Sequence, residues 1–165
     1  MRKLNFTPHN DYLRILLTQG IAAEAHHGQL DKAGEAYIWH PLRVGFSLLP
    51  DVDACIVGLL HDVFEDAPEN ANLQWRIDKD LMKDVITLTR IAGEPYEEYI
   101  LRVKTRPRAA IVKLADLADN LDMTRYNLAL ARGADPEKML ALHTRYLKAR
   151  SVLQGWSEQV NHNPD

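Results

Sequence analysis

Apolar residues recur at helical spacing through most of the chain, and polar or turn-forming residues separate the repeats. Aspartate, proline and glycine at the boundaries supply signals for helix starts and stops. No stretch shows the sustained apolar–polar alternation of a half-buried β-strand. We therefore expect an all-α fold with helices over residues 11–27, 40–49, about 51–66, 78–90, 96–103, 109–125 and 135–160.

The segment 54–66 is the most unusual part of this pattern. Its first half is apolar on nearly every side of a helix, which predicts burial, and its second half carries His61, Asp62, Glu65 and Asp66. Carboxylates are disfavoured at the C-terminal end of a helix, which is the negative end of its dipole. On a continuous helix, Glu65 and Asp66 lie one turn beyond His61 and Asp62. The pattern predicts a bound cation, and the alternative is an acidic helix end paired with nearby lysines.

Asp116 is the second unusual carboxylate. On its predicted helix it shares a side with Val112 and Met123, so it is expected to lie between apolar neighbours. A buried carboxylate is costly unless it is neutral, ion-paired or bound to a metal. Lys113 and Arg108 are the candidate partners for an ion pair, and a metal is the other explanation.

The residue types indicate which metals are suitable. Imidazole and carboxylate ligands without a thiolate suit Mn²⁺, Fe²⁺, Co²⁺ or Zn²⁺ better than Ca²⁺. His61, Asp62 and Asp116 supply three candidate ligands. Among the remaining histidines, His40 is the best candidate for a fourth, because Pro41 fixes it in the first turn of a helix.

Length, composition and charge narrow the class of protein. A chain of 165 residues with 46% hydrophobic residues suits one globular domain, here residues 1–165. The net charge of −3 gives no electrostatic reason to expect nucleic acid or an anionic membrane as a partner. A single cysteine, the lack of a signal-peptide pattern and the lack of a membrane-spanning run predict a cytoplasmic protein. The helix over 135–160 is expected to dock either on its own domain or on a partner chain, which would make a homo-oligomer.

A histidine, a His-Asp doublet and a distant aspartate, in this order, resemble the pattern of the HD-domain metal-dependent phosphohydrolases. The sequence is more closely similar to the hydrolase domain of the RelA/SpoT-type alarmone enzymes, and above all to their small stand-alone relatives. The resemblance covers about residues 20–125 and implies an all-helical fold. The stretches that carry it are residues 25–29, 32–41 and 61–66, then 113–116 together with Asn120.

The resemblance implies a role for each motif residue in the removal of the 3′-pyrophosphate from guanosine tetra- or pentaphosphate. An acidic pair would position or deprotonate the attacking water, and this pair is Glu65 and Asp66. The implied ligands of the metal, usually Mn²⁺, are His40, His61, Asp62 and Asp116. The implied substrate-binding residues are Lys32, Arg108 and Asn120.

The chain also departs from the family pattern. Asp31 replaces the first member of a basic pair that contacts the guanine base in the family, and Ala33 and Ala36 replace a serine and a proline. Leu117 and Asp119 stand where the family has arginine and histidine. The metal-binding and water-activating residues are therefore intact, while the base-reading surface is altered.

The sequence thus predicts a Mn²⁺-dependent hydrolase of a phosphorylated nucleotide, with guanosine 3′,5′-bis(diphosphate) as the leading substrate. One alternative is a phosphatase for another nucleotide, such as the 2′-phosphate of NADPH, because Asp31 changes the base-reading surface. A second alternative is a non-catalytic nucleotide-binding or regulatory module. The presence of Glu65 and Asp66 speaks against the second alternative, because a binding module does not need an acidic pair.

Overall fold

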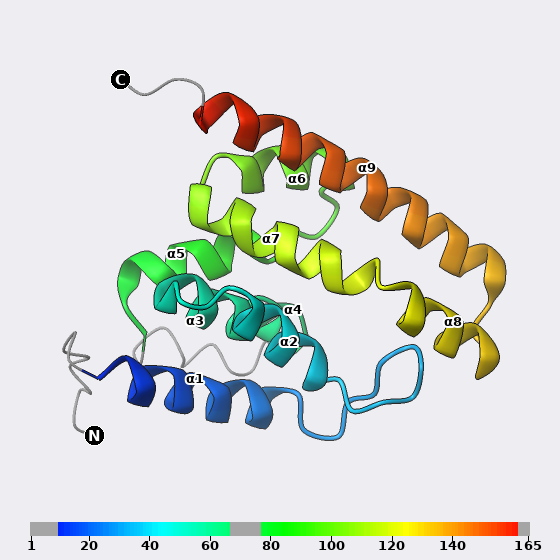
Figure 1. Ribbon diagram of the computed structural model, residues 1–165, viewed down its shortest axis with the longest axis horizontal. Coiled ribbons are helices and arrows are strands. Elements are labelled where there is room, and N and C mark those ends of the chain that lie inside the picture. The colour runs from blue at the N-terminus through cyan, green and yellow to red at the C-terminus, as the bar shows by residue number, and fades with distance from the viewer. Residues whose placement is uncertain (1–9, 67–76, 162–165) are drawn as a thin grey trace.

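The computed structural model describes residues 10–66 and 77–161, without the side chains of Asp66 and of residues 156–161. In this part of the chain there is no β-strand, only an isolated antiparallel bridge between Leu30 and Ala36. The predicted all-α fold is therefore confirmed (Figure 1). The helices are α1 Asp11–Ala25, α2 Trp39–Ser47, α3 Val52–Leu60, α4 Val63–Asp66, α5 Lys79–Leu88, α6 Tyr96–Lys104, α7 Pro107–Asn120, α8 Met123–Ala131 and α9 Pro136–Asn161.

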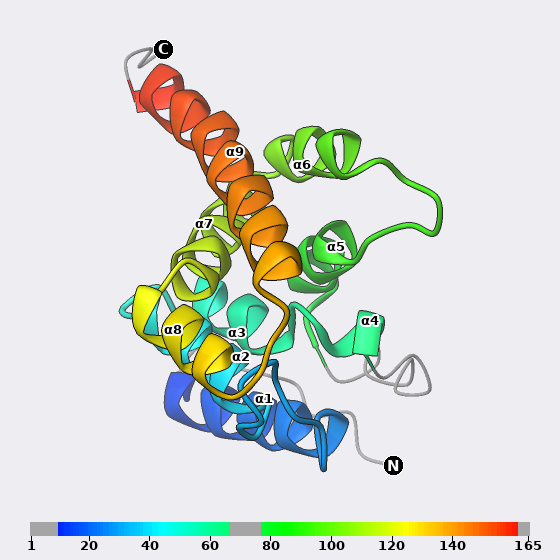
Figure 2. The same ribbon diagram turned by 90° about the vertical axis from the view of Figure 1, so that its right-hand side faces the viewer.

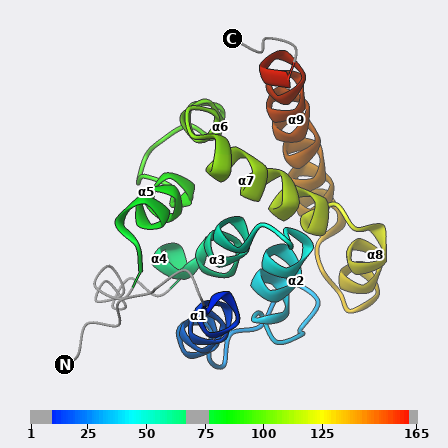
Figure 3. The same ribbon diagram turned by 60° about the vertical axis from the view of Figure 1, so that its left-hand side comes forward.

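Helix α3 lies at the centre of the core. It packs against α1, α2, α5 and α7, and every residue from Ala54 to Leu60 is buried, as its apolar sequence predicts (Figure 3). Helices α2 and α3 approach each other closely at Gly45 and Gly58. A Cβ atom on Gly58 would lie 2.9 Å from the Cα atom of Gly45, so a side chain there would force the two helices apart. Helix α2 thus packs closely on the second half of α3, and the His40 ring at the start of α2 lies 5.1 Å from the His61 ring just after α3.

The central helix is shorter than the sequence pattern predicts. It ends at Leu60, residues 61–62 form a turn, and α4 begins at Val63. The His61 Nδ1–H donates to the Gly58 carbonyl at 2.7 Å. In a continuous helix that carbonyl would accept from the backbone N–H of Asp62. The predicted helical spacing between His61 and Glu65 was therefore wrong.

A second difference is a break in the predicted helix over 109–125. Helix α7 ends at Asn120, and the Asp122 carboxylate accepts the backbone N–H of Thr124 at 2.8 Å. Aspartate is a strong helix N-cap, so it starts the separate helix α8, which the sequence analysis missed. Helix α8 lies beyond the end of α7 (Figure 1).

Helix α9 runs along α6 and α7 of its own chain (Figure 2). Its buried residues Ala149 and Leu153 join the core. Of the two places predicted for this helix, the structure shows the one on its own chain. No described helix is long and apolar enough to cross a lipid bilayer.

Candidate metal centre and cavity

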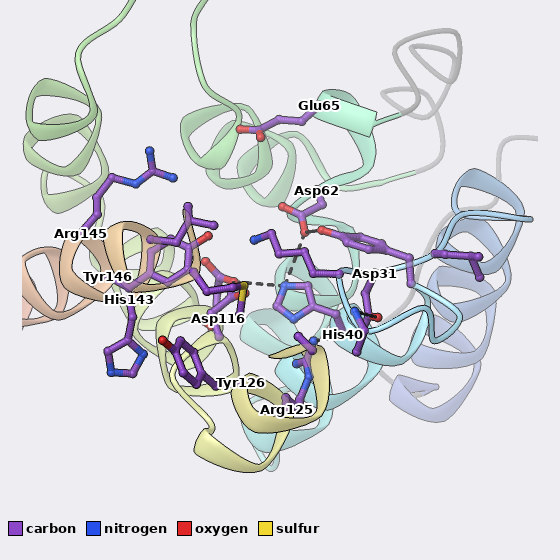
Figure 4. Close-up of a pocket in the computed structure, with 18 of the residues that line it drawn as sticks. Asp31, His40, Asp62, Glu65, Asp116, Arg125, Tyr126, His143, Arg145 and Tyr146 are labelled. Atoms are coloured by element: carbon purple, nitrogen blue, oxygen red, sulfur yellow. Dashed lines mark hydrogen bonds and ion pairs between the residues drawn. The ribbon is translucent and has the colours of Figure 1, made fainter. Parts of the chain in front are cut away.

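Four side chains from three parts of the chain meet at one point, as the sequence predicted for them. His40 comes from α2, His61 and Asp62 from the turn after α3, and Asp116 from α7. Ligand atoms of His40, His61 and Asp116 all lie within 4.8 Å of one another. Asp62 Oδ2 lies 3.5 Å from His40 Nε2 (Figure 4). The same oxygen lies 3.2 Å from His61 Nε2.

The two imidazole rings are fixed so that their Nε2 atoms face the aspartates. His61 Nδ1 donates to the Gly58 carbonyl, and His40 Nδ1 donates to Asp119 Oδ2 at 2.7 Å. Both protons are thus held on Nδ1, which leaves the Nε2 lone pairs available. His61 Nε2 is buried without a hydrogen-bond partner among the described residues. A divalent cation would satisfy this atom, so the donor set fits a metal.

Electrostatics at this point favour a cation. Burial alone lowers the pKa of both histidines, but the neighbouring aspartates outweigh burial and raise it, for His61 well above its ordinary value. Burial opposes ionisation of Asp62, yet the nearby imidazoles hold its pKa well below the ordinary value. Two ionised aspartates therefore attract positive charge to the place where the Nε2 atoms converge.

Asp116 has further partners on its own helix. Lys113 Nζ lies 2.7 Å from Asp116 Oδ2, and the Asn120 side-chain amide donates to Asp116 Oδ1 at 2.5 Å. Burial opposes the ionised form of Asp116, but Lys113 and the two histidines keep its pKa far below the ordinary value. The structure thus shows the ion pair with Lys113 that the sequence left open, together with the metal-like cluster.

Arg108 lies outside this group. Its Nη1 is 2.7 Å from Asp84 Oδ2 and 3.3 Å from Asp80 Oδ2, both on α5. Arg108 does not line the cavity beside the metal cluster. The structure therefore does not bring Arg108 to the site, either as a partner of Asp116 or as a substrate-binding residue, and its contacts join α7 to α5.

Glu65 lines the same cavity as Asp62. Because the helix is interrupted at residues 61–62, the orientation of the Glu65 side chain is not the one that a continuous helix would give. Its Oε1 accepts the backbone N–H of Arg90 at 2.6 Å, beyond the end of α5. Burial raises the pKa of Glu65, Asp62 adds to this effect, and the bond from Arg90 opposes it. A raised pKa suits a group that exchanges a proton with water. The side chain of Asp66 lies outside the described part of the structure.

A cavity of about 380 Å³ opens beside the cluster. The expected nucleotide-site residues Lys32 and Asn120 line it. Tyr37 also lines it and donates from its hydroxyl to Asp62 Oδ2 at 2.6 Å. The far wall comes from α6, α8 and α9, and its residues are Tyr96, Tyr126, Ala129, Met139, Leu142, His143, Arg145 and Tyr146.

Two of the departures from the family pattern are linked in space. Arg125 contacts Asp119 and also lies 3.4 Å from Asp31 Oδ2. Arg43 holds Asp119 as well, through its Nε at 2.6 Å. Asp119 therefore orients His40, a role that sequence reasoning missed. The signal was present, because Asp119 follows Asp116 by three residues and so lies on the same side of the helix.

Asp31 itself is tied to its own loop. Its Oδ1 accepts the backbone N–H groups of Ala33 at 2.8 Å and of Glu35 at 3.0 Å. Such bonds from an aspartate to the following backbone stabilise a turn. Asp31 therefore shapes the loop between α1 and α2 and offers no cationic group to a bound base.

The all-helical fold with a His/His-Asp/Asp cluster is similar to the fold of HD-type domains. No protein-family model matches the chain. A solved structure described as a metazoan ortholog of SpoT that hydrolyses ppGpp has the same fold, with a TM-score of 0.57 and 20% sequence identity. The likeness covers 82% of this chain and 93% of that one.

Sequence comparison points to the same relatives. The guanosine-3′,5′-bis(diphosphate) 3′-pyrophosphohydrolase of Aquifex aeolicus is 34% identical over 112 residues, which are 61% of this chain and 16% of the relative. The bifunctional (p)ppGpp synthase/hydrolase SpoT of Escherichia coli is 28% identical over 131 residues, which are 70% of this chain and 19% of the relative. The chain thus spans less than a fifth of the length of these curated relatives. The resemblance to RelA/SpoT-type hydrolase domains is confirmed.

Proposed function

We propose that this protein is a Mn²⁺-dependent hydrolase that removes the 3′-pyrophosphate from guanosine 3′,5′-bis(diphosphate). The observation that carries the proposal is the convergence of His40, His61, Asp62 and Asp116 beside Glu65 in one cavity. The printed names of the relatives, which are 3′-pyrophosphohydrolases of this nucleotide, support the choice of substrate.

The four converging side chains would hold the metal, and their outer partners would orient them. Imidazole and carboxylate donors together suit Mn²⁺. A divalent ion at this place would lower the pKa of a bound water and polarise a phosphoryl oxygen. Asp119 and the Gly58 carbonyl keep the two imidazoles in the required tautomer, and Tyr37 holds Asp62.

Glu65 is the proposed general base. Its raised pKa and its place in the cavity suit the acceptance of a proton from the attacking water. Asp66 is proposed as its partner, as the family pattern implies. Lys32 would offset negative charge on a phosphate of the substrate. Asn120 would contact the nucleotide and also orients Asp116, because its side-chain amide donates to that carboxylate. Arg108 has no part in this proposal.

The cavity fits a nucleotide in size and lining. Its volume of about 380 Å³ lies within the range of roughly 300–1,000 Å³ that is usual for small-molecule sites. The acidic groups lie on the side of the metal cluster, and Tyr126, Met139 and Leu142 supply aromatic and apolar surface for a base on the other side. The sequence also predicts a single domain over residues 1–165 and a cytoplasmic location, and it leaves open whether the chain forms a homo-oligomer.

A second candidate is a phosphatase for another nucleotide, such as NADPH. It is favoured by Asp31, because this carboxylate is committed to its own loop and to Arg125 where the family has a basic residue against the guanine base. Guanine would then lose a contact that the family uses. The metal cluster and Glu65 would serve both candidates equally.

A panel of phosphorylated nucleotides with Mn²⁺ tests the proposal. We expect guanosine 3′,5′-bis(diphosphate) to have the highest kcat/KM and to yield guanosine 5′-diphosphate and pyrophosphate. Glu65→Gln should lower kcat by about 10²–10⁴-fold, the usual contribution of general acid–base catalysis, without loss of metal. Equal turnover of all nucleotides would reject the leading substrate. Binding without turnover in the wild-type protein would favour the non-catalytic module.

A further inference from the structure

Two arginines lie against one tyrosine in the wall of the cavity. The Cζ atom of Arg145, on α9, is 4.6 Å from the centroid of the Tyr96 ring, and that of Arg90, in the loop before α6, is 5.7 Å from it. All three residues line the cavity. In Figure 4, Arg145 and Tyr146 project from α9 on the side of the cavity across from His40 and Asp31.

This group has polar atoms that the protein itself does not satisfy. Arg145 Nε and Tyr96 Oη are buried and have no hydrogen-bond partner in the described part of the chain. Among the described residues neither guanidinium has an ion pair within 4.0 Å or a side-chain hydrogen bond, and Arg90 acts on Glu65 and Glu94 only as a more distant charge. A buried donor without a partner costs free energy, so such atoms usually mark the place of an absent ligand or water.

Two other cations of the cavity, Lys113 and Arg125, are committed to carboxylates, whereas Lys32 lies on the side of the metal cluster. Lys113 pairs with Asp116, and Arg125 pairs with Asp119 and Asp31. The contrast shows that Arg90 and Arg145 are not simply part of a general network of ion pairs around the cavity.

The acids of the cavity are also distributed unevenly. Its carboxylates come from the loop before α2, from the segment after α3 and from α7. Among the lining residues, α8 and α9 contribute no acid. Arg90 and Arg145 are both positively charged and repel each other at the Tyr96 ring. An anion bound between the two guanidinium groups would offset this repulsion.

We propose that Arg90, Tyr96 and Arg145 form a phosphate-binding subsite for a phosphate group of the substrate other than the one at the metal cluster. Guanidinium groups bind phosphate with paired, charge-assisted hydrogen bonds, and the tyrosine hydroxyl adds a donor. Burial raises the pKa of Tyr96, so this hydroxyl stays protonated and able to donate. The inference rests on the proposed function, because it assumes a nucleotide with more than one phosphate.

Two phosphates of such a nucleotide have the required chemistry. One is the outer phosphate of the diphosphate that is removed, and the other belongs to the diphosphate at the 5′ end. Inorganic pyrophosphate and guanosine 5′-diphosphate represent these two sources separately. Neither is a substrate of the proposed reaction, so their binding reports on the subsite even if the hydrolase assignment fails.

Calorimetric titration of the metal-loaded protein with each of these two compounds is the test. The variant is Arg145→Gln, and the matched control is Lys148→Gln, which removes the same charge from an exposed position of α9 outside the cavity lining. We expect Arg145→Gln to weaken binding of one compound by about tenfold or more, in line with the loss of a charge-assisted hydrogen bond, and the control to bind as wild type. The compound that is affected identifies the source of the phosphate.

Unchanged binding of both compounds in a folded Arg145→Gln protein would overturn the subsite, as would failure of the wild type to bind either compound. If Arg145→Gln lowers the melting temperature too far for titration, Arg90→Gln decides by the same criterion, because Arg90 is exposed and its removal leaves the core intact. A binding loss in a protein that shows no hydrolysis would keep the subsite and reject the proposed function.

Discussion

The two sides of the cavity differ in how their charged groups are satisfied. Around the metal cluster, each acid has a protein partner: Asp116 has Lys113, and Asp119 has His40 and two arginines. On the α6–α9 side, Arg90 and Arg145 have no such partner among the described residues. Side chains that are hydrogen-bonded to one another keep their positions before a ligand binds. Donors without a protein partner form their hydrogen bonds only when a ligand binds. The comparison therefore separates a preorganised candidate metal centre from the proposed phosphate-binding surface.

The largest effect is expected from removing an imidazole of the reaction centre. His61→Ala deletes the buried Nε2 that has no partner in the described structure. Loss of an outer partner of a metal ligand costs about 10–100-fold in metal affinity, and loss of a ligand should exceed that range. Metal content by mass spectrometry and kcat/KM should fall together. His27→Ala is the control, because this exposed imidazole lies outside the cavity lining, and equal metal content in both variants would contradict the assigned centre.

The next effect concerns the bond that orients the other imidazole. Asp119→Asn weakens the acceptor of the His40 Nδ1 proton, and we expect metal affinity to fall by about tenfold, within the usual range for such partners. Asp31→Asn is the matched control, because Asp31 shares Arg125 with Asp119 but has no bond to His40. If both variants lose metal affinity equally, the hydrogen bond from His40 to Asp119 is not what maintains metal affinity, and the ion pairs with Arg125 are.

The reaction centre could be predicted from the sequence because its residues lie in short, distinctive stretches. The His61-Asp62 doublet is followed by carboxylates at the unfavourable end of a helix, and Asp116 is a carboxylate among apolar neighbours, so the sequence alone marked both as unusual. The details of the turn could not be predicted in the same way. Helix α3 ends early because the His61 side chain takes the Gly58 carbonyl that a backbone N–H would otherwise use. The spacing of apolar residues along the sequence does not show which of these two donors binds the carbonyl.

The recognition side could not be predicted from the pattern along the chain. Arg90, Tyr96 and Arg145 lie on three separate elements, and each looks like an ordinary surface or core residue in its own segment. Only the packing of α9 along α6 brings them together. The position of Arg108 could not be predicted for a related reason. The family resemblance implied a substrate-binding role for Arg108, but this side chain pairs with Asp84, a buried acid of α5, and does not line the cavity.

Arg108→Gln should therefore affect stability and leave substrate binding unchanged. Asp84 would keep only Arg106 as a partner, and we expect a loss of about 1–3 kcal/mol in the free energy of unfolding, the cost of leaving a buried acceptor poorly satisfied. Urea denaturation measures this loss, and the KM for the nucleotide should stay at the wild-type value. A raised KM with unchanged stability would return Arg108 to the substrate site.

The smallest effect is expected at Glu94, which fixes the loop between Arg90 and Tyr96. Glu94 accepts from Arg102 at 2.7 Å, and Arg102 also donates to carbonyls at the end of α5. Arg102 lowers the pKa of Glu94 to about 2. Because the folded-state pKa is depressed, the pair stabilises the protein above the ordinary pKa of about 4.3, and this contribution disappears as pH falls toward 2. Unfolding curves of wild type and Glu94→Gln should thus differ slightly at pH 7 and converge in acid. A difference that persists at low pH would mean that Glu94 holds the loop by packing and not by charge.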